Sequence, residues 1–526
     1  MKPLRDYIPN HHIAGHFTVN LVLTNIVIAI SVFSFGFDNV LYNTIQAMKP
    51  FKKQFGTYDA DKKSWDIDST HLAFLNSFPL LVYAVGLLLA MFIGERYGRR
   101  LVLVLMQLLC LAGVAVTYTS TTFGQILAGR CLVQAYIGMQ EWLVPMLQAE
   151  LVPASIRGSM VALFVFEHQF AAFICSIITN FTSKHTDNSA WRIPVVIMFA
   201  WPSLVLLLQW VVPESPRWLL RQDRFDDAVA SLHHLYGCSQ DYSAAEEAQL
   251  LKESLDEVDQ VSKGEWRDLW KGTNRRRTMI AVVAAAMSML SGNAFTSSYG
   301  TVFLAQVGGI DAFTGTMIKK VVVLCGPITA MILLENLGRR RMYMAWGTVA
   351  GLALLVMGAL GTQDPLSKKY KQGIVAMAIF FPYARIVSFG ALASLMPPAE
   401  VPSARLRDKT SFAAWTTQNF FDFVTSFTLP YLLNAPYAHL QSKVGFIYGS
   451  FCIAGVVWAY FCMPELKGRS LEEVEEIFEQ KVPARHMRNW KSSNQQSVGV
   501  RVTQLENETA GTARSHLERK IAEVEA

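Results

Sequence analysis

Long apolar runs alternate with short polar connections along most of the chain, from residue 19 to residue 463. About 20 consecutive apolar residues can span a lipid bilayer as an α-helix. The pattern therefore predicts an all-α membrane protein with twelve membrane-spanning helices. The runs cover residues 19–44, 72–94, 101–120, 124–147, 159–180, 193–212, 278–305, 313–334, 342–362, 373–396, 411–433 and 444–463.

Three features of the chain occur twice. They are a basic turn, a Glu and an Arg seven residues apart, and a Pro-Glu pair. Their copies begin at Gly98 and Gly338, at Glu150 and Glu400, and at Pro213 and Pro464, so that each spacing lies between 240 and 251 residues. A nearly constant spacing indicates an internal duplication. We expect two pseudo-symmetric six-helix bundles, at residues 19–212 and 278–463.

Polar segments flank and join the two bundles. Residues 1–18 form a short N-terminal tail. Residues 213–277 are polar and helix-prone and end in three arginines, which predicts a small helical linker domain. Residues 464–526 hold a C-terminal motif and a tail, and residues 481–526 of that tail are expected to be mostly disordered.

Arginines gather on alternate connections, around residues 96–100, 157, 275–277, 339–341 and 405–407. Cytoplasmic connections of membrane proteins carry the excess of Lys and Arg. We therefore expect both tails and the linker to be cytoplasmic in a multi-pass protein of the cell membrane. Lysines in the opposite loops 45–71 and 363–372 weaken this bias without reversing it. Asn180 begins a glycosylation sequon that is predicted to lie in an external loop.

Composition and motifs disfavour several other classes of protein. Apolar residues make up 52% of the chain and charged residues only 17%, and the net charge of +6 sits at membrane edges, so we expect no nucleic-acid partner. The seven cysteines lie mostly inside apolar runs, which disfavours a disulfide framework. The first run is too long for a cleavable signal peptide. No phosphate loop, metal cluster or nucleophile constellation is evident, so we expect neither an enzyme nor a cofactor.

Short motifs punctuate the ends of the predicted helices. They are Glu95-Arg96-Tyr97-Gly98-Arg99-Arg100, Pro145, Glu150 with Pro153 and Arg157-Gly158, Trp191-Arg192-Ile193-Pro194, Pro213-Glu214-Ser215-Pro216-Arg217-Trp218-Leu219, and Pro464-Glu465-Leu466-Lys467-Gly468-Arg469-Ser470-Leu471-Glu472-Glu473. Over about residues 20–480 the chain thereby resembles the sugar porter family of the major facilitator superfamily. Residues 291–293 and 400–407 are similar to fungal hexose, disaccharide and quinate carriers. The resemblance implies alternating access, with two six-helix halves rocking about a central site.

Two ionisable residues lie at matching depths in the first and fourth runs. Asp38 is near the outer end of the first run, and Arg130 is about two turns from the outer end of the fourth. A charge in the hydrocarbon costs roughly 3 kcal/mol on insertion scales, so each needs a reason. The resemblance implies that Asp38 and Arg130 form the proton-coupling pair of a symporter. The alternative is a permanent buried salt bridge.

The basic turns resemble the cytoplasmic charge network of the family. The resemblance implies a gate that is latched by ion pairs in the outward-facing state and broken in the inward-facing state. The simpler role of these charges is to anchor the topology. The residues concerned are Glu95, Arg96, Arg99, Arg100, Glu150, Arg157, Arg339, Arg340, Glu400 and Arg407.

A substrate site is expected near the middle of the membrane, between the halves. Amides and tyrosines suit the many hydroxyl groups of a sugar. Polar residues at that depth are Gln169, Ser288, Asn293, Tyr299, Gln418 and Asp422. The resemblance implies that Gln169 and Asn293 are sugar ligands, although a single amide in a bundle can also simply join two helices.

The chain departs from the family pattern at several of these positions. The seventh-helix glutamine pair falls on Ser288 and Met289, the eleventh-helix asparagine on Asp422, and the tenth-helix tryptophan on Leu395. Arg385 in the tenth run, and Lys319 and Lys320 in the eighth, are further charges that a hexose does not require. Arg385 and Asp422 form an internal pair on one interpretation. On the other, they bind a charged substrate.

The combined pattern predicts a transporter of a sugar or sugar-like small molecule, coupled to protons and embedded in the bilayer. One alternative is a carrier of a quinate-like polyhydroxy acid or a secondary metabolite. A second alternative is a nutrient receptor that does not transport, which the short tail at residues 481–526 disfavours.

Overall fold

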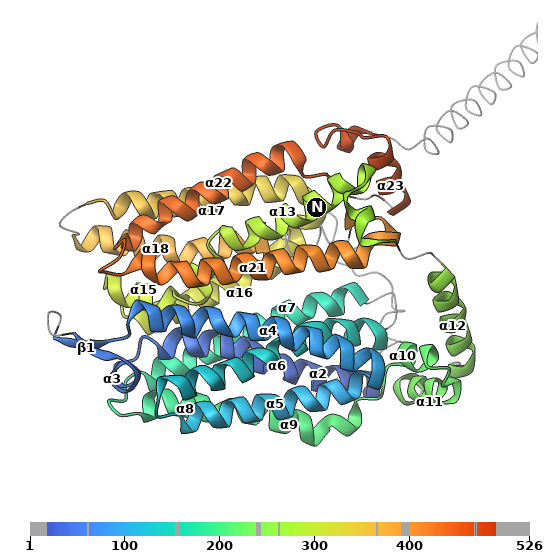
Figure 1. The fold of residues 1–526 in the computed structure, drawn as a ribbon, viewed down its shortest axis with the longest axis horizontal. Coiled ribbons are helices and arrows are strands. Elements are labelled where there is room, and N and C mark those ends of the chain that lie inside the picture. Colours follow the sequence, from blue (N-terminus) through green and yellow to red (C-terminus); the bar gives the residue numbers. More distant parts are fainter. Residues whose placement is uncertain are drawn as a thin grey trace, which may run out of the picture.

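The computed structural model describes residues 18–490, except for residues 60–62, 153–156, 238–242, 261–263, 364–366, 391–399, 468 and 470. The described chain is almost entirely helical and confirms the expected all-α fold. It forms two helical bundles that lie side by side with their long axes parallel (Figure 1).

The N-terminal bundle contains the first six predicted spans. The sixth is divided into two helices, near Pro194 and Pro202. The spans are α2 (Val19–Ile45), α4 (Ser69–Tyr97), α5 (Arg99–Thr119), α6 (Phe123–Leu151), α7 (Arg157–Thr182), and α8 (Ser189–Ile197) with α9 (Ala200–Leu208).

The C-terminal bundle contains the other six spans. They are α13 (Gly272–Leu290) with α14 (Asn293–Ser297) and α15 (Gly300–Val307), α16 (Ala312–Leu337), α17 (Arg339–Leu360), α18 (Lys368–Arg385) with the π-helical turn η4 (Ile386–Gly390), α21 (Arg407–Leu433) and α22 (Val444–Cys462). Ten of the described spans are long and apolar enough to cross a membrane. The other two, α6 and α21, are less apolar and hold polar residues along their length, among them Arg130 and Asp422.

The two bundles repeat one packing pattern. In the N-terminal bundle, α2 packs on α7, and α6 packs on both α4 and α5; in the C-terminal bundle, α13 packs on α21, and α18 packs on both α16 and α17. The first, second, third, fourth and fifth spans thus pack on one another as the seventh, eighth, ninth, tenth and eleventh do, which agrees with the duplicated motifs. Contacts between α4 and α21 and between α7 and α16 join the two bundles.

Two predicted spans of the C-terminal bundle are also interrupted. The seventh was predicted as one run over residues 278–305, but α13 ends before Gly292, whose φ of +93° places it in the left-handed region. Glycine adopts this conformation without a Cβ penalty, so the helix breaks there and restarts at Asn293. The tenth span changes to a π-helical turn directly after Arg385, a feature that often accompanies functional sites.

The connections place the two ends of the molecule. One end carries α3 (Lys49–Phe55) and a hairpin of β1 (Thr57–Asp59) and β2 (Ser64–Asp66), and we call it the hairpin end. The opposite end, the linker end, carries most of the linker and the described part of the chain that follows α22, residues 464–490, which we call the C-terminal segment (Figure 1). Its elements are α10 (Pro216–Arg221), α11 (Phe225–Tyr236), α12 (Ala244–Gln260), η3 (Trp266–Trp270), α23 (Leu471–Glu479) and η7 (Met487–Asn489).

Two boundaries differ from the sequence-based expectation. The arginines at 275–277 belong to α13 rather than to the linker, because that helix begins at Gly272. The tail was expected to be disordered from residue 481, but Ala484 and Met487 are buried. Apolar side chains of residues 481–490 thus pack on the protein, and residues 491–526 lie outside the described chain.

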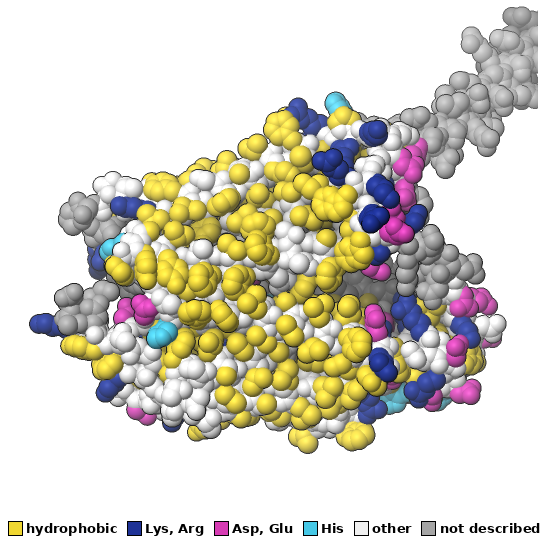
Figure 2. All heavy atoms as spheres, in the orientation of Figure 1, with side chains coloured by type: hydrophobic (Ala, Val, Ile, Leu, Met, Phe, Trp, Pro, Cys, Tyr) yellow, Lys and Arg dark blue, Asp and Glu magenta, His cyan; other side chains and the backbone are white. Residues whose placement is uncertain are grey.

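The outer surface of the bundles is apolar over the middle of the molecule. Figure 2 shows hydrophobic side chains across both bundles, with charged side chains gathered toward the ends and most densely at the linker end. Phe92, Leu207 and Ile332 are 62%, 74% and 60% exposed. Such a belt suits lipid tails and would be a liability in water.

Candidate functional site

Asp38 and Arg130 lie close together inside the N-terminal bundle. Both are buried. Asp38 Oδ2 accepts a hydrogen bond from Gln134 Nε2 at 3.0 Å, and the Arg130 guanidinium lies 4.0 Å from the centroid of the Tyr42 ring. The two charges are near enough to attract each other. Asp38 Oδ1 and Arg130 Nε and Nη1 nevertheless have no hydrogen-bond partner among the described residues. The carboxylate therefore keeps one oxygen on which a proton can be placed.

A second charged group lies where the seventh span breaks. Asn293, the first residue of α14, donates from Nδ2 to Asp422 Oδ1 of α21 at 3.2 Å. Arg385, the last residue of α18, donates from Nη1 to the Ser288 carbonyl at 3.3 Å. Asp422 lies within electrostatic range of Arg385. Three helices thus bring an amide, an acid and a cation to one place in the C-terminal bundle.

The other predicted substrate ligands are arranged differently. Gln169 in α7 and Gln418 in α21 are half-buried, and neither side chain forms a hydrogen bond with another described residue. Free amides of this kind can bind hydroxyl groups. Ser288 and Met289, near the end of α13, are buried, at 1% and 7% exposed.

Tyr299 connects the two bundles toward the hairpin end. Its hydroxyl lies 3.1 Å from two carbonyl oxygens, those of Leu72 in α4 and Ser426 in α21. Nearby, the Thr301 amide donates to Asn43 Oδ1 of α2 at 3.0 Å. In this conformation the Tyr299 hydroxyl is therefore engaged in closing the two halves against each other.

Two aromatic pairs also cross between α4 and α21. The centroids of Phe74 and Phe427 are 6.2 Å apart, and those of Tyr83 and Trp415, farther from the hairpin end, are 5.9 Å apart. Within the described chain, the side-chain hydrogen bonds and ring contacts between the two bundles lie from the Tyr83–Trp415 pair toward the hairpin end.

The basic turn of the N-terminal bundle is an ordered ion-pair site. Arg99 forms a bidentate pair with Glu150, with Nε to Oε2 and Nη2 to Oε1 both at 3.2 Å. Its Nη1 also donates to the Gly94 carbonyl at 2.7 Å. Glu214 accepts from the backbone amides of Arg99, at 2.8 Å, and of Arg100, at 3.2 Å. A carboxylate thus caps the positive N-terminal end of α5.

The C-terminal bundle repeats this arrangement. Arg339 Nη2 pairs with Glu400 Oε1 at 3.0 Å. Glu465 accepts from the amides of Arg339, at 3.0 Å, and of Arg340, at 3.2 Å, which caps α17 as Glu214 caps α5. Arg340 Nη2 also donates to the Tyr460 carbonyl at 2.6 Å. The two halves therefore share the ion pair and the helix cap as well as the sequence motif.

Glycine is required at both turns. Gly98 and Gly338 have φ values of +101° and +81°, which side chains rarely tolerate. A Cβ at Gly98 would lie 2.4 Å from Glu214 Oε2, and a Cβ at Gly338 would lie 2.7 Å from Glu465 Oε2. Because each glycine has no side chain, the capping carboxylate fits against its backbone.

The remaining predicted gate residues whose side chains are described do not connect the two halves. Glu95 and Arg96 are exposed, and the Glu95 carbonyl accepts a hydrogen bond from Trp218 Nε1 of the linker at 2.9 Å. Arg407 begins α21, and its Nε has no partner within the described chain. The side chain of Arg157, like Leu395, lies outside the described residues. Every gate ion pair in the described chain therefore stays inside one bundle.

Asn180 does not lie in a loop as predicted. It belongs to the last turn of α7, which ends at Thr182, and its Nδ2 lies 3.8 Å from Met317 Sδ of α16. The contact between α7 and α16 half-buries the amide that a glycan would modify.

Several partners were missed by sequence reasoning. Gln134 stands four residues after Arg130, so helical periodicity placed it on the same face, yet it was not assigned to Asp38. Glu214 and Glu465 were noted as repeated motifs, but their capping role needs the folded chain. The partner of Lys319, the Thr296 carbonyl at 3.1 Å, lies on the broken seventh span and carries no sequence signal.

Comparison with known proteins agrees with this geometry. The family described as "Sugar (and other) transporter" matches residues 24–478. The low-affinity glucose transporter HXT1 of Saccharomyces cerevisiae is 26% identical over 501 residues, which cover 92% of this chain and 85% of HXT1. The high glucose sensor RGT2 of the same yeast is 26% identical over 467 residues, which cover 87% of this chain and 60% of the sensor.

The fold is similar to that of the xylose transporter XylE from E. coli. Its inward open conformation has a TM-score of 0.69 and 20% identity and covers 86% of this chain and 98% of XylE. The proton:xylose symporter XylE bound to 6-bromo-6-deoxy-D-glucose has a TM-score of 0.67 and 21% identity, over 87% of this chain and 99% of that one. At this identity the likeness concerns the fold.

Proposed function

This chain belongs to the sugar porter family of major facilitator transporters, and on that premise we propose that it carries a neutral, sugar-like polyhydroxy solute across the membrane together with a proton. Proton coupling is proposed on the basis of the environment of the Asp38 carboxylate. It is buried and bonded to Gln134 through one oxygen, and its other oxygen is unpartnered within the described chain.

Protonation of Asp38 changes the balance of charge around Arg130. With Asp38 ionised, the carboxylate attracts the arginine across a buried space, where electrostatic interactions are strong. With Asp38 protonated, Arg130 keeps its contact with the Tyr42 ring but loses its counter-charge. Because the two charge states favour different separations of α2 and α6, a bound proton can bias the conformation of the bundle.

The substrate is proposed to be neutral because Arg385 already has an acid beside it. An arginine dedicated to an anionic ligand would be expected to face it without a competing carboxylate. Here Asp422 supplies that charge, and Asn293 holds the Asp422 carboxylate from the other side. The amides of Gln169 and Gln418 then remain available for hydroxyl groups. This arrangement favours a sugar-like solute over a polyhydroxy acid.

The structure is proposed to represent an inward-facing state, with the linker end in the cytoplasm. Two observations support this. The side-chain contacts that join the bundles gather toward the hairpin end, and the gate ion pairs at the linker end stay within each bundle. A reporter fused within residues 213–277 should be inaccessible from outside intact cells. External labelling of that reporter would contradict the topology.

The decisive experiment is uptake of radiolabelled solutes by transporter-null yeast that expresses the chain. A panel of hexoses, pentoses, disaccharides, polyols and quinate-like acids would be tested with and without an imposed proton gradient. We expect saturable uptake of a neutral solute that the gradient increases. Uptake restricted to an acid, or indifferent to the gradient, would refute the corresponding part of the proposal.

A second candidate function is sensing without transport, which the similarity to RGT2 favours. It is distinguished by the same experiment together with a binding measurement. A receptor would bind a solute at the central site of the purified protein, yet vesicles containing the protein would take up none of it.

A further inference from the structure

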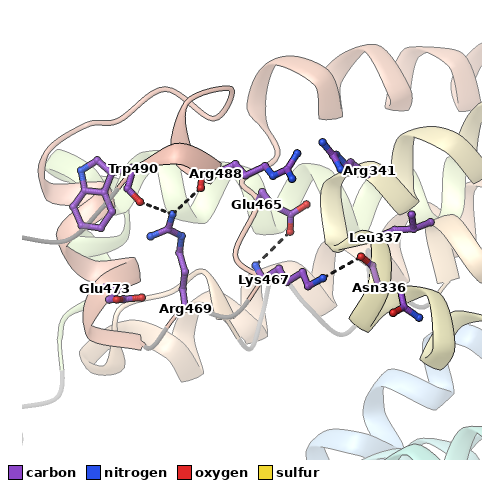
Figure 3. Close-up of a pocket in the computed structure, with 9 residues that line it drawn as sticks. All are labelled: Asn336, Leu337, Arg341, Glu465, Lys467, Arg469, Glu473, Arg488 and Trp490. Atoms are coloured by element: carbon purple, nitrogen blue, oxygen red, sulfur yellow. Dashed lines mark hydrogen bonds between the residues drawn. The ribbon is translucent and has the colours of Figure 1, made fainter. Parts of the chain in front are cut away.

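A pocket of about 500 Å³ lies at the linker end of the C-terminal bundle, away from the proposed transport path. It lies where the last residues of α16 and the first turn of α17 meet the C-terminal segment, which includes α23 (Figure 3). Its charged lining consists of Arg341, Lys467, Arg469, Arg488, Glu465 and Glu473. Four cations against two acids give the pocket a net positive charge.

Part of this charge serves the structure of the pocket itself. Glu465 is engaged by the amides at the start of α17 and by the Lys467 amide. Arg469 donates from Nη2 to the carbonyls of Met487 at 2.6 Å and Trp490 at 2.8 Å, which fixes the C-terminal segment as one wall. Lys467 Nζ bonds the Asn336 carbonyl at 3.0 Å and keeps its positive charge at the rim.

Two arginines of the pocket have no such structural task. Arg341 in α17 and Arg488 in the C-terminal segment are exposed, and neither guanidinium forms a hydrogen bond or an ion pair with another described residue. In the view of Figure 3 the two groups point toward one another. Because both guanidinium groups line the same pocket and neither has an ion-pair partner among the described residues, an anion in the pocket would be stabilised.

We propose that this pocket binds a phosphorylated ligand, with one phosphate group bridging Arg341 and Arg488 and Lys467 adding a third cation. The planar guanidinium matches phosphate oxygens with paired hydrogen bonds, whereas lysine contributes a point charge. The proposal is independent of the transported solute. A bound phosphate would tie the start of α17 to the C-terminal segment, because its two arginines come from those two elements.

This phosphate chemistry has two possible sources. One is a phosphorylated lipid headgroup in the adjacent leaflet, because basic pockets at the cytoplasmic ends of membrane helices suit such headgroups. Leu337, 40% exposed, lines the same pocket and offers an apolar contact at the membrane edge. The other is a soluble organic or inorganic phosphate, which the open pocket also admits.

The test uses the full-length protein in nanodiscs. In one arm, neutral nanodiscs are titrated with inorganic phosphate and with inositol 1,4,5-trisphosphate by calorimetry. In the other, native mass spectrometry measures the retention of phosphatidylinositol 4,5-bisphosphate against phosphatidylserine. Binding in the soluble arm assigns a free phosphate, whereas retention of the bisphosphate lipid alone assigns a headgroup. Both results support the proposal, and the absence of binding in both arms overturns it.

The variants test the location. Arg341→Gln with Arg488→Gln should weaken binding at least tenfold, and each single variant should have an intermediate effect. Arg221→Gln is the matched control, because Arg221 is an exposed arginine of α10 outside the pocket, and it should bind within twofold of the wild type. A monodisperse double variant that binds as tightly as the wild type would overturn the assignment. If the double variant is not monodisperse, the two single variants decide the same question.

Discussion

Replacing Arg385 or Asp422 one at a time should destabilise the protein, whereas replacing both should restore most of the loss. Arg385→Gln leaves the half-buried Asp422 carboxylate without its nearby cation and with the hydrogen bond from the Asn293 amide. Asp422→Asn leaves the Arg385 guanidinium with the Ser288 carbonyl and with Nε unpartnered among the described residues. Breaking a fully buried pair typically costs about 3–5 kcal/mol, and because both side chains are half-buried we expect each single variant to cost about 1–3 kcal/mol.

The structure ranks the two single variants. The Asn293 hydrogen bond persists in Arg385→Gln and contributes roughly 1.5 kcal/mol or more, because its acceptor is charged. The loss of stability in that variant should therefore lie near the lower end of the range. Asp422→Asn should fall near the upper bound. In the double variant, neither of the two replacement amides carries a charge, and the expected coupling energy for this half-buried pair is about 1–2 kcal/mol.

The assay is unfolding of purified variants in mixed micelles with increasing SDS, combined with measurements of surface expression and uptake. The matched control is Arg224→Gln with Asp227→Asn, a linker pair of 2.7 Å whose side chains are 53% and 55% exposed. Exposed pairs of this kind should couple by no more than about 0.5 kcal/mol. A coupling energy near zero for Arg385 and Asp422 would refute the electrostatic interaction between them. A stable Arg385→Gln variant that loses uptake of an acid would instead assign the arginine to an anionic substrate.

Four further variants test other contacts. Asp38→Asn should abolish accumulation and remove its pH dependence, while exchange of internal for external solute persists; accumulation at the wild-type level would contradict the coupling. Met289→Gln should raise hexose affinity about fivefold, the effect of roughly 1 kcal/mol from one restored hydrogen bond, and an unchanged KM would argue against a hexose pocket. Tyr299→Phe removes the hydroxyl that joins α4 and α21, so labelling of an engineered hairpin-end cysteine from outside should increase; unchanged labelling would exclude that role. Glu465→Gln weakens the cap of α17 and should cost about 1–2 kcal/mol of stability, whereas a neutral effect would show that the cap is dispensable.

The sequence alone determined the helices and their repetition. Apolar runs of bilayer length have few alternatives to a spanning helix, because lipid leaves the backbone no other hydrogen-bond partners. The motifs at Gly98 and Gly338 recur because one turn geometry, with a positive φ and a glutamate against the glycine, was needed in both bundles. For the same reason the pairs of Arg99 with Glu150 and Arg339 with Glu400 follow the repeat.

Only the tertiary structure decided which polar groups meet in the membrane. Asp422 and Asn293 are 129 residues apart, and their contact depends on the packing of α21 against α14 and on the break at Gly292. Tyr299 could be assigned to a sugar by its chemistry, but in this conformation its hydroxyl joins Leu72 to Ser426. The pocket between Arg341 and Arg488 likewise depends on a segment that composition predicts to be disordered. These contacts join distant segments, and local propensity carries no information about which distant partner a side chain will find.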